Sequence, residues 1–324
     1  MPASDMGGIE QALARVYDTV LRPVFAISKK RRRLDRFGIR DPEGLGCAAL
    51  DPQDRTDGCL PLCADIVRDH RRYVGAFAFG DATGTAGPAW PRRILPAIID
   101  LAQYRGFADY AAELKRLSKG ATLRQIRKAR NSGFVCRQIH RRRYHRELFE
   151  IETSARFRSV GLVLAAYLRR PPADAGGDIA DRQPPRPHCP LHWSIYWGVF
   201  APDEGGGERL VGFIFVKRVG NSARIAALMG HNRYLSAHVM KLLFADVMRW
   251  LLDREDPSVR GLRYLHYGAL EDGNDGLAFW KSRFRFHPSV FGWAEGQRPL
   301  PSAAPSAIEA AGMVRRPGLS PTDP

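Results

Sequence analysis

The sequence predicts a mixed α/β fold in which a mostly antiparallel central sheet is flanked by helices. Three strand-like runs follow one another at 193–201, 210–219 and 223–229, and a turn with three consecutive glycines separates the first two. The segment 236–252 has the apolar spacing of a long amphipathic helix, and another strand-like run follows at 262–269. Antiparallel hairpins therefore come first, and a helical crossover comes later.

The segments around these elements add further helices and strands. Periodicity predicts helices at 62–70, 106–117, 122–131, 143–154, 160–168 and 277–283. Strands or extended runs are predicted at 73–79, 94–101, 134–139 and 284–291. Thr122 is expected near the N-cap of its helix, and Gly133 is expected to end that helix.

Composition divides the chain into four expected parts. Residues 1–45 are expected to form a helix and a basic arm, and 46–115 an N-terminal lobe or partial lobe. Residues 116–295 are expected to form the main domain, and the Pro-, Ala- and Ser-rich segment 296–324 a disordered tail. Whether 46–94 forms a separate domain stays open, and the proline-rich loop 170–190 is the candidate mobile segment.

The chain is strongly basic, with a formal net charge of +16 and a calculated pI of about 10.1. Such a charge indicates an anionic partner, which includes nucleic acids, phosphate-rich cofactors and acidic membranes. Between Lys115 and Arg146 the chain has many basic residues and no acidic residue, which favours a polyanion partner over a merely solvated face. The basic residues of this stretch are Lys115, Arg116, Lys119, Arg124, Arg127, Lys128, Arg130, Arg137, Arg141, Arg142, Arg143 and Arg146.

The N-terminal segment and the cysteines bear on location. An amphipathic stretch at 9–27 precedes the basic run 29–33, so residues 9–36 are a candidate for weak membrane-surface contact, although packing on the chain itself is favoured. No membrane span or signal peptide is apparent. The odd number of scattered cysteines indicates a reducing compartment, and we expect a cytoplasmic protein.

A zinc site is considered and not favoured on the sequence alone. Cys59 and Cys63 are four residues apart and near His70, but a structural zinc site usually has two close ligand pairs. The second pair would be Cys189 with His188 or His192, which is distant in the sequence and adjacent to a proline. Buried thiols are the favoured interpretation, so no metal is expected.

The order of elements after residue 193 is similar to that of the GNAT-type N-acyltransferases, and three local patterns resemble their Fem-like branch. The first is an "IDL" strand followed by a basic helix, the second has the form I-x-x-S-x-x-x-R, and the third resembles the family's C-terminal ending. The residues that carry them are 99–101, 107–110 and 123–133; 151–154 with Arg158; and 267–269, 274–277, 279–281 and 284–288. Arg285 stands where the family usually has glycine, and the family's R-x-x-G-x-G/A loop is absent before the long helix.

The resemblance implies an acyl donor at the N-terminus of the long helix, where unpaired backbone N–H groups can hold pyrophosphate. The expected cofactor-binding residues are Gly230, His231, Asn232, Arg233 and Ser236. Acyl-CoA, with acetyl-CoA as the simplest case, is the expected donor, and aminoacyl-tRNA is the alternative. An ordinary loop with Ser236 as the helix N-cap is the competing interpretation.

Acyl transfer to an amine requires proton transfer and stabilisation of an oxyanion. His266 and Tyr267 end the strand after the long helix, with His266 as a candidate base and Tyr267 as a candidate proton donor to the leaving group. Adjacent strand residues face opposite ways, so both cannot enter one cleft, and Tyr267 is preferred. Simple packing of both rings against the sheet is the competing interpretation. Lys281 matches the family's lysine and is a candidate for binding an oxyanion or phosphate, against an ordinary solvated lysine. His231 is the group titrating nearest neutral pH, and the alternative bases are Glu271 and Asp272.

Two function classes remain open. The first is an N-acyltransferase that transfers an acyl or aminoacyl group to a primary amine, with Arg124, Arg127 and Arg158 contacting substrate phosphate. The second is a non-catalytic protein that binds RNA or DNA on a degenerate acyltransferase fold. Walker, nucleophile-elbow, HExxH and dinucleotide-binding motifs are absent from the sequence.

Overall fold

The computed structural model describes most of the chain between residues 45 and 294, which belongs to one compact unit within 41–297. The predicted tail and Glu271 lie outside the described residues, as do residues 1–44 of the N-terminal helix and arm and most of the proline-rich loop. The described residues are 45–52, 59, 61–75, 77, 95–155, 157–158, 161–162, 187, 189–203, 206–270 and 272–294.

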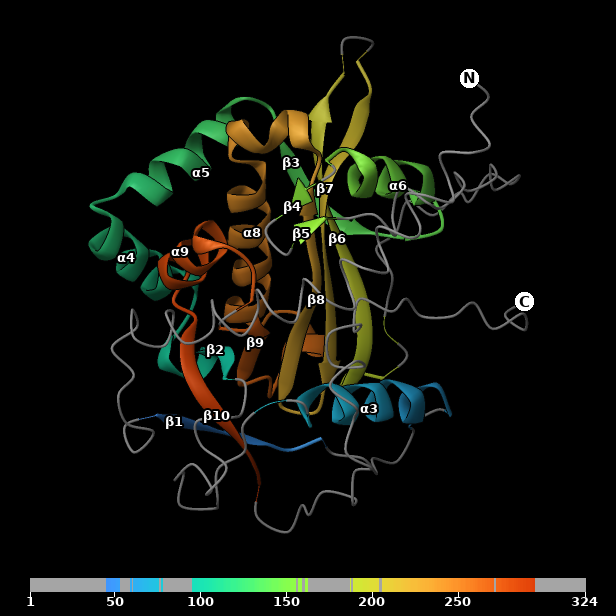
Figure 1. The fold of residues 1–324 in the computed structure, drawn as a ribbon, viewed down its shortest axis with the longest axis vertical. Coiled ribbons are helices and arrows are strands. Elements are labelled where there is room, and N and C mark those ends of the chain that lie inside the picture. The colour runs from blue at the N-terminus through green and yellow to red at the C-terminus, as the bar shows by residue number, and fades with distance from the viewer. Residues whose placement is uncertain are drawn as a thin grey trace. The chain divides into compact units, whose positions relative to one another are not determined.

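An open eight-stranded sheet forms the centre of this unit (Figure 1). In the described part of the chain its parallel pairs are β1–β10 and β8–β9, and the other neighbours are antiparallel. The fold is therefore mixed α/β with a mostly antiparallel sheet, as the sequence predicts. The strand order is β1 (Gly46–Leu50), β10 (His287–Trp293), β2 (Pro96–Asp100), β9 (Tyr264–Ala269), β8 (Ser222–Gly230), β7 (Glu208–Val219), β6 (His192–Pro202) and β3 (Val135–Ile139).

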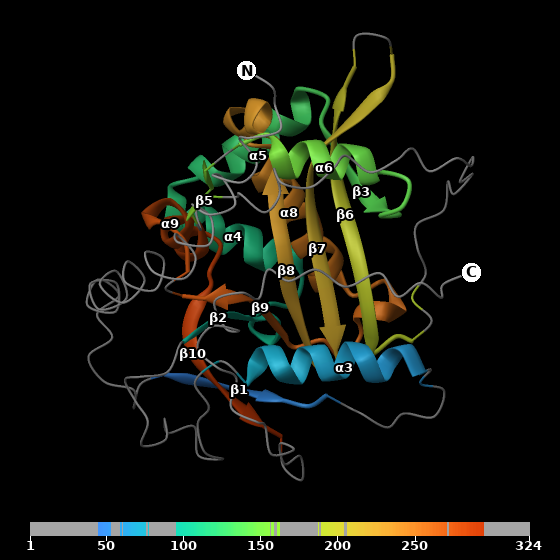
Figure 2. The same ribbon diagram turned by 45° about the vertical axis from the view of Figure 1, so that its right-hand side comes forward.

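Helices cover both faces of the sheet. Figure 2 shows α3 (Pro61–Val74) across the ends of β6, β7 and β8, with α6 (His145–Thr153) further along the same face. The opposite face carries α8 (Val239–Asp253), which packs against α4 (Phe107–Ser118) and α5 (Ala121–Asn131), while α9 (Asp275–Arg283) contacts α4. The shorter elements are η3 (Leu101–Gln103), η4 (Asn232–Ala237), η5 (Pro257–Val259), β4 (Phe157–Arg158) and β5 (Gly161–Leu162).

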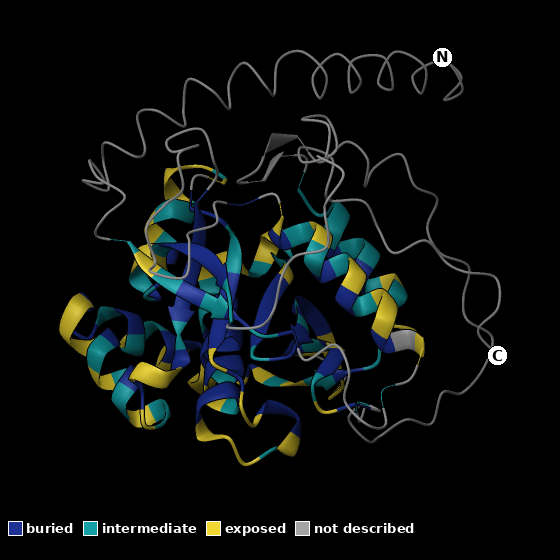
Figure 3. Cartoon of the chain, turned by 90° about the horizontal axis from the view of Figure 1, so that it is seen from below, coloured by how far each residue is buried: buried dark blue, intermediate teal, exposed yellow. Residues whose placement is uncertain are grey.

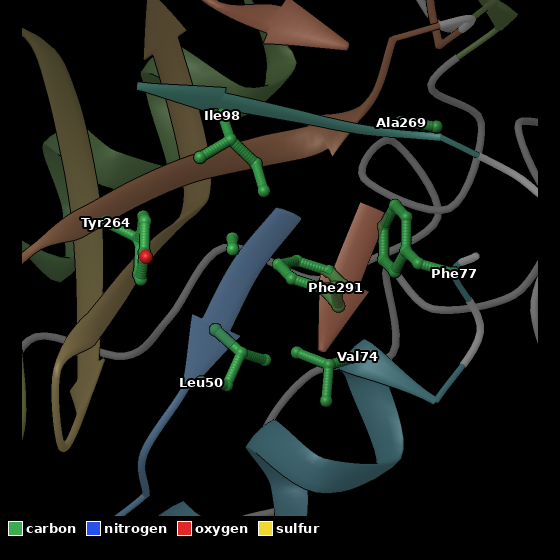
Figure 4. Packing of buried hydrophobic residues seen from close by; sticks show 8 residues of the cluster. Leu50, Val74, Phe77, Ile98, Tyr264, Ala269 and Phe291 are labelled. Atoms are coloured by element: carbon green, nitrogen blue, oxygen red, sulfur yellow. The ribbon is translucent and has the colours of Figure 1, made fainter. Parts of the chain in front are cut away.

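The apolar core lies between the sheet and the helices on each face. On the α3 face, Val74 and Phe77 pack against Leu50, Ile98 and Phe291, so four segments distant in sequence share one cluster (Figure 4). A second cluster lies under α6 and includes residues of β3, β6 and β7. Figure 3 shows the exposed residues concentrated on the outer helices and turns, as expected for amphipathic helices on a buried sheet.

Asn221 fixes the edge of the sheet to the β7–β8 turn. Its amide group donates to the Ala49 carbonyl and accepts from the Asp51 N–H, both at 2.9 Å. The preceding Gly220 has φ of +57°, and a Cβ there would lie 1.8 Å from the Asp51 oxygen. Only glycine permits this approach, so the turn and the end of β1 are locked together.

Several predicted boundaries are wrong. Residues 73–74 continue α3 rather than beginning a strand, and Tyr73 and Val74 pack in the core cluster from the last turn of this helix. The helix predicted at 160–168 is contradicted where it is described, since Gly161–Leu162 pairs as a strand with Phe157–Arg158. The N-cap of α5 is Gly120, whose left-handed conformation suits glycine, so Thr122 lies near the N-cap as predicted.

Candidate functional site

Strands β8 and β9 separate soon after they begin. Their parallel pairing covers Ser222–Arg224 and Tyr264–His266, which is three of the nine residues of β8. The register between β7 and β8 then shifts so that Ala226 has no partner in β7, which is a β-bulge. Bulges twist a strand away from its neighbour. Ala226 is exposed, and no described strand pairs with β8 beyond Arg224 on the side of β9.

The polypeptide between β8 and α8 is a 3₁₀ turn rather than the first turn of a helix. His238 has a left-handed backbone (φ 63°), and α8 begins at Val239. Ser236 is therefore not the N-cap, and the predicted start of the helix at residue 236 is wrong. The left-handed residue breaks the helical path, so η4 and α8 are separate elements.

Backbone donors of η4 are largely occupied by the chain itself. The N–H of His231 donates to Val211 O, and the N–H of Asn232 donates to Ser154 Oγ at 3.0 Å. The Arg233 N–H donates to His231 Nδ1 at 3.3 Å. The expected pyrophosphate cradle would have to replace these bonds, whereas the exposed side chains of Asn232 and Arg233 remain accessible.

Gly230 has a packing reason that the sequence did not indicate. A Cβ there would lie 2.7 Å from Leu235 and 2.8 Å from the Met240 sulfur. The side chains of Leu235 and Met240 therefore occupy the space that a side chain at residue 230 would need. Glycine at this position lets η4 and the first turn of α8 fold back onto the end of β8.

A cluster of basic groups, which sequence reasoning missed, lies at the start of α8. Burial, then Lys241 and Lys128, lower the pKa of His238. Burial and Arg283 lower the pKa of Lys241, whose Nζ donates to Gln125 Oε1 at 2.5 Å. The positive charges come from α5, α8 and α9, and they disfavour the protonated forms of His238 and Lys241. A bound anion would relieve that repulsion.

Tyr267 and Lys281 meet at the end of β9. The Tyr267 ring contacts Trp280 and Phe286, with ring centroids 5.9 and 6.1 Å apart, and the Lys281 Nζ lies 5.1 Å from the Tyr267 ring. Burial, then Asp272, raise the pKa of the Tyr267 phenol. Lys281 is fully buried and donates to the Ala269 carbonyl, so it is not a solvated lysine.

His266 lies on the opposite face of the sheet from Tyr267. It is fully buried beneath α3, where its ring contacts His70, Tyr73 and Phe291. Burial lowers its pKa well below the usual value, and neither ring nitrogen has a hydrogen-bond partner among the described residues. The expectation that these adjacent strand residues face different surroundings is confirmed by these contacts.

The three arginines expected to contact phosphate come from two elements, α5 and β4. Arg124 and Arg127 are exposed on α5, and Arg124 donates to the Lys119 carbonyl at 3.2 Å. Arg158 lies in the short strand β4. Exposed Lys128, on the same helix, belongs to the basic cluster at α8, so α5 contributes one missed residue to that site.

Arg285 has a backbone conformation that is unusual for a residue other than glycine. It has φ of +66°, a left-handed conformation in which glycine is unstrained. Its guanidinium pairs with Glu113 at 2.9 Å, which anchors the side chain to α4.

Four metal-binding side chains, from segments that sequence reasoning judged too distant, meet on the α3 face. Cys59, Cys63, Cys189 and His192 offer donor atoms that all lie within 4.8 Å of one another. This cluster is separate from the elements that carry Tyr267 and Lys241. The expectation of buried thiols holds for Cys63 and Cys189, but the spatial pairing of the two segments was missed.

No family model and no curated protein matches this chain. One similar solved structure is the C-terminal DUF2156 domain of a putative lysylphosphatidylglycerol synthetase from Agrobacterium fabrum, with a TM-score of 0.34 and 12% identity. The match covers 60% of this chain and 57% of that one, so this chain spans little more than half of that structure. This likeness is too low to support an argument about function. Within the described residues, no helix combines the length and the apolar character that crossing a membrane requires.

Proposed function

We propose that this chain is an N-acyltransferase that moves an acyl or aminoacyl group to a primary amine. The observation that carries the proposal is the separation of β8 from β9 after three paired residues, with α8 as the connection between them. A parallel pair that opens at a bulge leaves backbone groups of β8 available to an extended donor, in the manner of strand addition. The three Fem-like sequence patterns support the same function.

In this proposal the donor's phosphates bind at the basic cluster of Lys128, His238, Lys241 and Arg283. Like charges drawn together from α5, α8 and α9 create a positive potential that a phosphate would neutralise. The first turn of α8 adds the positive end of the helix dipole. Either a CoA thioester or an aminoacyl-tRNA supplies such phosphates, so the cluster supports both donors. Asn232 and Arg233 are proposed to contact the donor through their exposed side chains.

Tyr267 is proposed to protonate the leaving group. The amine attacks the donor's carbonyl carbon and forms a tetrahedral oxyanion, whose collapse breaks the bond to the thiol sulfur or ribose oxygen. The leaving group takes the proton of Tyr267, and the proton lost by the amine nitrogen restores the phenol. A raised pKa keeps the phenol protonated at neutral pH, as a proton donor must be. Lys281 is proposed to position the end of β9 through Ala269. His266 lies on the other face of the sheet, and burial lowers its pKa well below the usual value. We therefore assign it no part in the reaction.

The test is calorimetric titration of the full chain with acetyl-CoA and, in parallel, with a short aminoacylated RNA. Lys241→Ala is expected to weaken donor binding at least about tenfold, or about 1.4 kcal/mol. Arg68→Ala is the matched control, because it removes one positive charge from α3 on the opposite face. Failure of both donors to bind the wild-type chain would refute the proposal.

The alternative is a non-catalytic polyanion-binding protein. It is favoured by the exposed side chains of Arg124, Arg127 and Lys128 on α5, none of which takes part in an ion pair among the described residues. Equal binding of charged and uncharged RNA, with no acetyl-CoA binding, would favour this function.

A further inference from the structure

We propose that Cys59, Cys63, Cys189 and His192 form a structural zinc site that joins the start of α3 to the start of β6. Cys59 precedes α3 and Cys63 lies in its first turn, whereas Cys189 precedes β6 and His192 is the first residue of that strand. Two short segments about 130 residues apart in the sequence thus contribute two donors each. Three thiolates and one imidazole are one of the common ligand sets of structural zinc.

The distances among the donor atoms of Cys59, Cys189 and His192 fit a tetrahedral zinc ion, and the Cys63 sulfur lies within 4.8 Å of each of them. With Zn–S of about 2.3 Å and Zn–N of about 2.0 Å, two sulfurs lie about 3.8 Å apart and a sulfur lies about 3.5 Å from a nitrogen. The Cys59 and Cys189 sulfurs are 3.9 Å apart, and they lie 3.3 and 3.6 Å from His192 Nδ1. A disulfide would require about 2.05 Å, and no disulfide joins any of the five cysteines, all of which are described.

His192 is held in the tautomer that a metal ligand needs. Its Nε2 lies 2.9 Å from the carbonyl oxygen of Pro52, and because a carbonyl only accepts, Nε2 must carry the proton. In the neutral imidazole the lone pair then belongs to Nδ1, which is the atom facing the thiols. A backbone carbonyl behind the ring is the usual way in which proteins orient a zinc-bound histidine.

The surroundings favour a zinc site with a net negative charge. Cys63, in the first turn of α3, lies near the positive end of the helix dipole, which stabilises a thiolate. Arg218 is fully buried and donates to the carbonyls of Gly220, Ser258 and Arg260, and no carboxylate pairs with it among the described residues. Cys189 interacts electrostatically with this guanidinium. One Zn²⁺ with three thiolates carries a net charge of −1, which would balance it.

The site is closed rather than catalytic. Cys63, Cys189 and His192 are each at most 5% exposed, and four protein donors fill a tetrahedral coordination shell. Binding would release the thiol protons to solvent and tie α3 to the strand beneath it. The proposed site is independent of the acyltransferase proposal, since it shares no residue with the basic cluster or with Tyr267.

The experiment is metal analysis of the untagged full chain, purified under reducing conditions. We expect about one zinc per chain by elemental mass spectrometry. Replacement by cobalt is expected to produce the intense visible bands of a tetrahedral ion and a thiolate-to-cobalt charge-transfer band. Failure of the wild-type chain to hold zinc, both as purified and after reconstitution with zinc salt, would overturn the proposal. So would a cobalt spectrum of octahedral type.

Variants locate the ion. Cys63→Ser and Cys189→Ser are expected to lose most of the bound zinc in competition with a chelating indicator, whereas Cys136→Ser should retain it. Cys136 is the matched control, because it is a partly buried cysteine on β3, outside the cluster. If the cluster variants fail to fold, the cobalt spectrum of the wild-type chain still decides the question. Retention of full zinc by both cluster variants would contradict this ligand assignment.

Discussion

At the scale of single residues, the buried histidines beneath α3 have a consequence for acid stability. Burial lowers the pKa of His70 to about 3, and burial also lowers that of His266. The unfolded chain protonates each imidazole below about pH 6.5, whereas the folded chain does not. Stability is therefore complete above about pH 6.5 and falls as the pH drops toward 3, by about 1.4 kcal/mol per pH unit for each ring.

His266→Leu tests this effect. Leucine is close in volume, and the lost nitrogens have no hydrogen-bond partner among the described residues, so stability at pH 7.5 is expected to change by less than about 1 kcal/mol. The free energy of unfolding, measured in urea between pH 6 and 4, should depend less steeply on pH in this variant. We expect its slope against pH to be smaller by about 1.4 kcal/mol per pH unit than in the wild-type chain. Phe291→Leu, which alters a neighbour without a titratable group, should lower stability equally at every pH. An unchanged slope in His266→Leu would contradict the assignment.

Tyr267 is the residue on which the proposed chemistry depends. Tyr267→Phe removes only the phenolic oxygen, so we expect donor binding to persist while the rate of acyl transfer falls about 10²-fold or more. Single-turnover transfer to a primary amine measures this rate. Tyr104→Phe is the control, because it also removes a tyrosine hydroxyl, but one outside β9. That hydroxyl donates a hydrogen bond to Glu113 at 2.7 Å. Equal transfer rates for Tyr267→Phe and the wild-type chain would exclude Tyr267 as the proton donor.

At the scale of elements, α3 is held to the sheet by Asp69 as well as by apolar packing. Asp69 pairs with Lys217 of β7 at 2.7 Å and with Arg224 of β8. Burial raises the pKa of Asp69, but Arg224 and Lys217 outweigh it, and the net pKa is lowered. The pair with these cations therefore stabilises the fold above the usual carboxyl pKa and is lost as the pH falls through the lowered value.

Asp69→Asn is expected to lower the free energy of unfolding at pH 7 by about 1–2 kcal/mol. Two cations with little exposure would lose their counter-charge, but Asp69 is 42% exposed, so solvent screening reduces the effect below that of a fully buried pair. Chemical denaturation measures the change. Asp65→Asn, on the same helix in a well-exposed pair with Arg68, should change stability by less than about 0.5 kcal/mol. A similar loss of unfolding free energy in both variants would show that the ion pairs of Asp69 stabilise the fold no more than an exposed surface pair does.

At the scale of the whole molecule, the net charge of +16 makes salt dependence the decisive property. If single-stranded RNA binds along α5, the triple variant of Arg124, Arg127 and Lys128 to alanine should reduce the slope of log affinity against log salt by about 2. Filter binding over a salt series measures it. The control triple of Arg68, Arg72 and Arg105 to alanine removes equal charge outside α5 and should leave most of the slope. Equal slopes for the two triples would indicate non-specific charge attraction.

The membrane-surface prediction also belongs to the whole chain. Residues 9–36 lie outside the described residues, so their contact with acidic lipid stays a prediction from the sequence.

The sequence by itself determined the fold class and most of its elements. The strands at 193–201, 210–219 and 223–229 and the helices at 106–117 and 122–131 match the structure closely, because apolar periodicity is a local property that each segment carries. It also determined that His266 and Tyr267 face apart, since alternation along a strand is equally local.

Tertiary structure decided what depends on contacts distant along the chain. Residues 73–74 stay helical because Val74 and Phe77 pack against β1 and β10, and α8 begins at Val239 because Met240 and Leu235 fold onto Gly230. Lys281 is buried rather than solvated, and its ammonium group donates a hydrogen bond to the Ala269 carbonyl. The meeting of Cys59 and Cys63 with Cys189 and His192 depends on how α3 crosses β6. Sequence spacing cannot reveal a site whose ligand pairs are brought together only by the sheet.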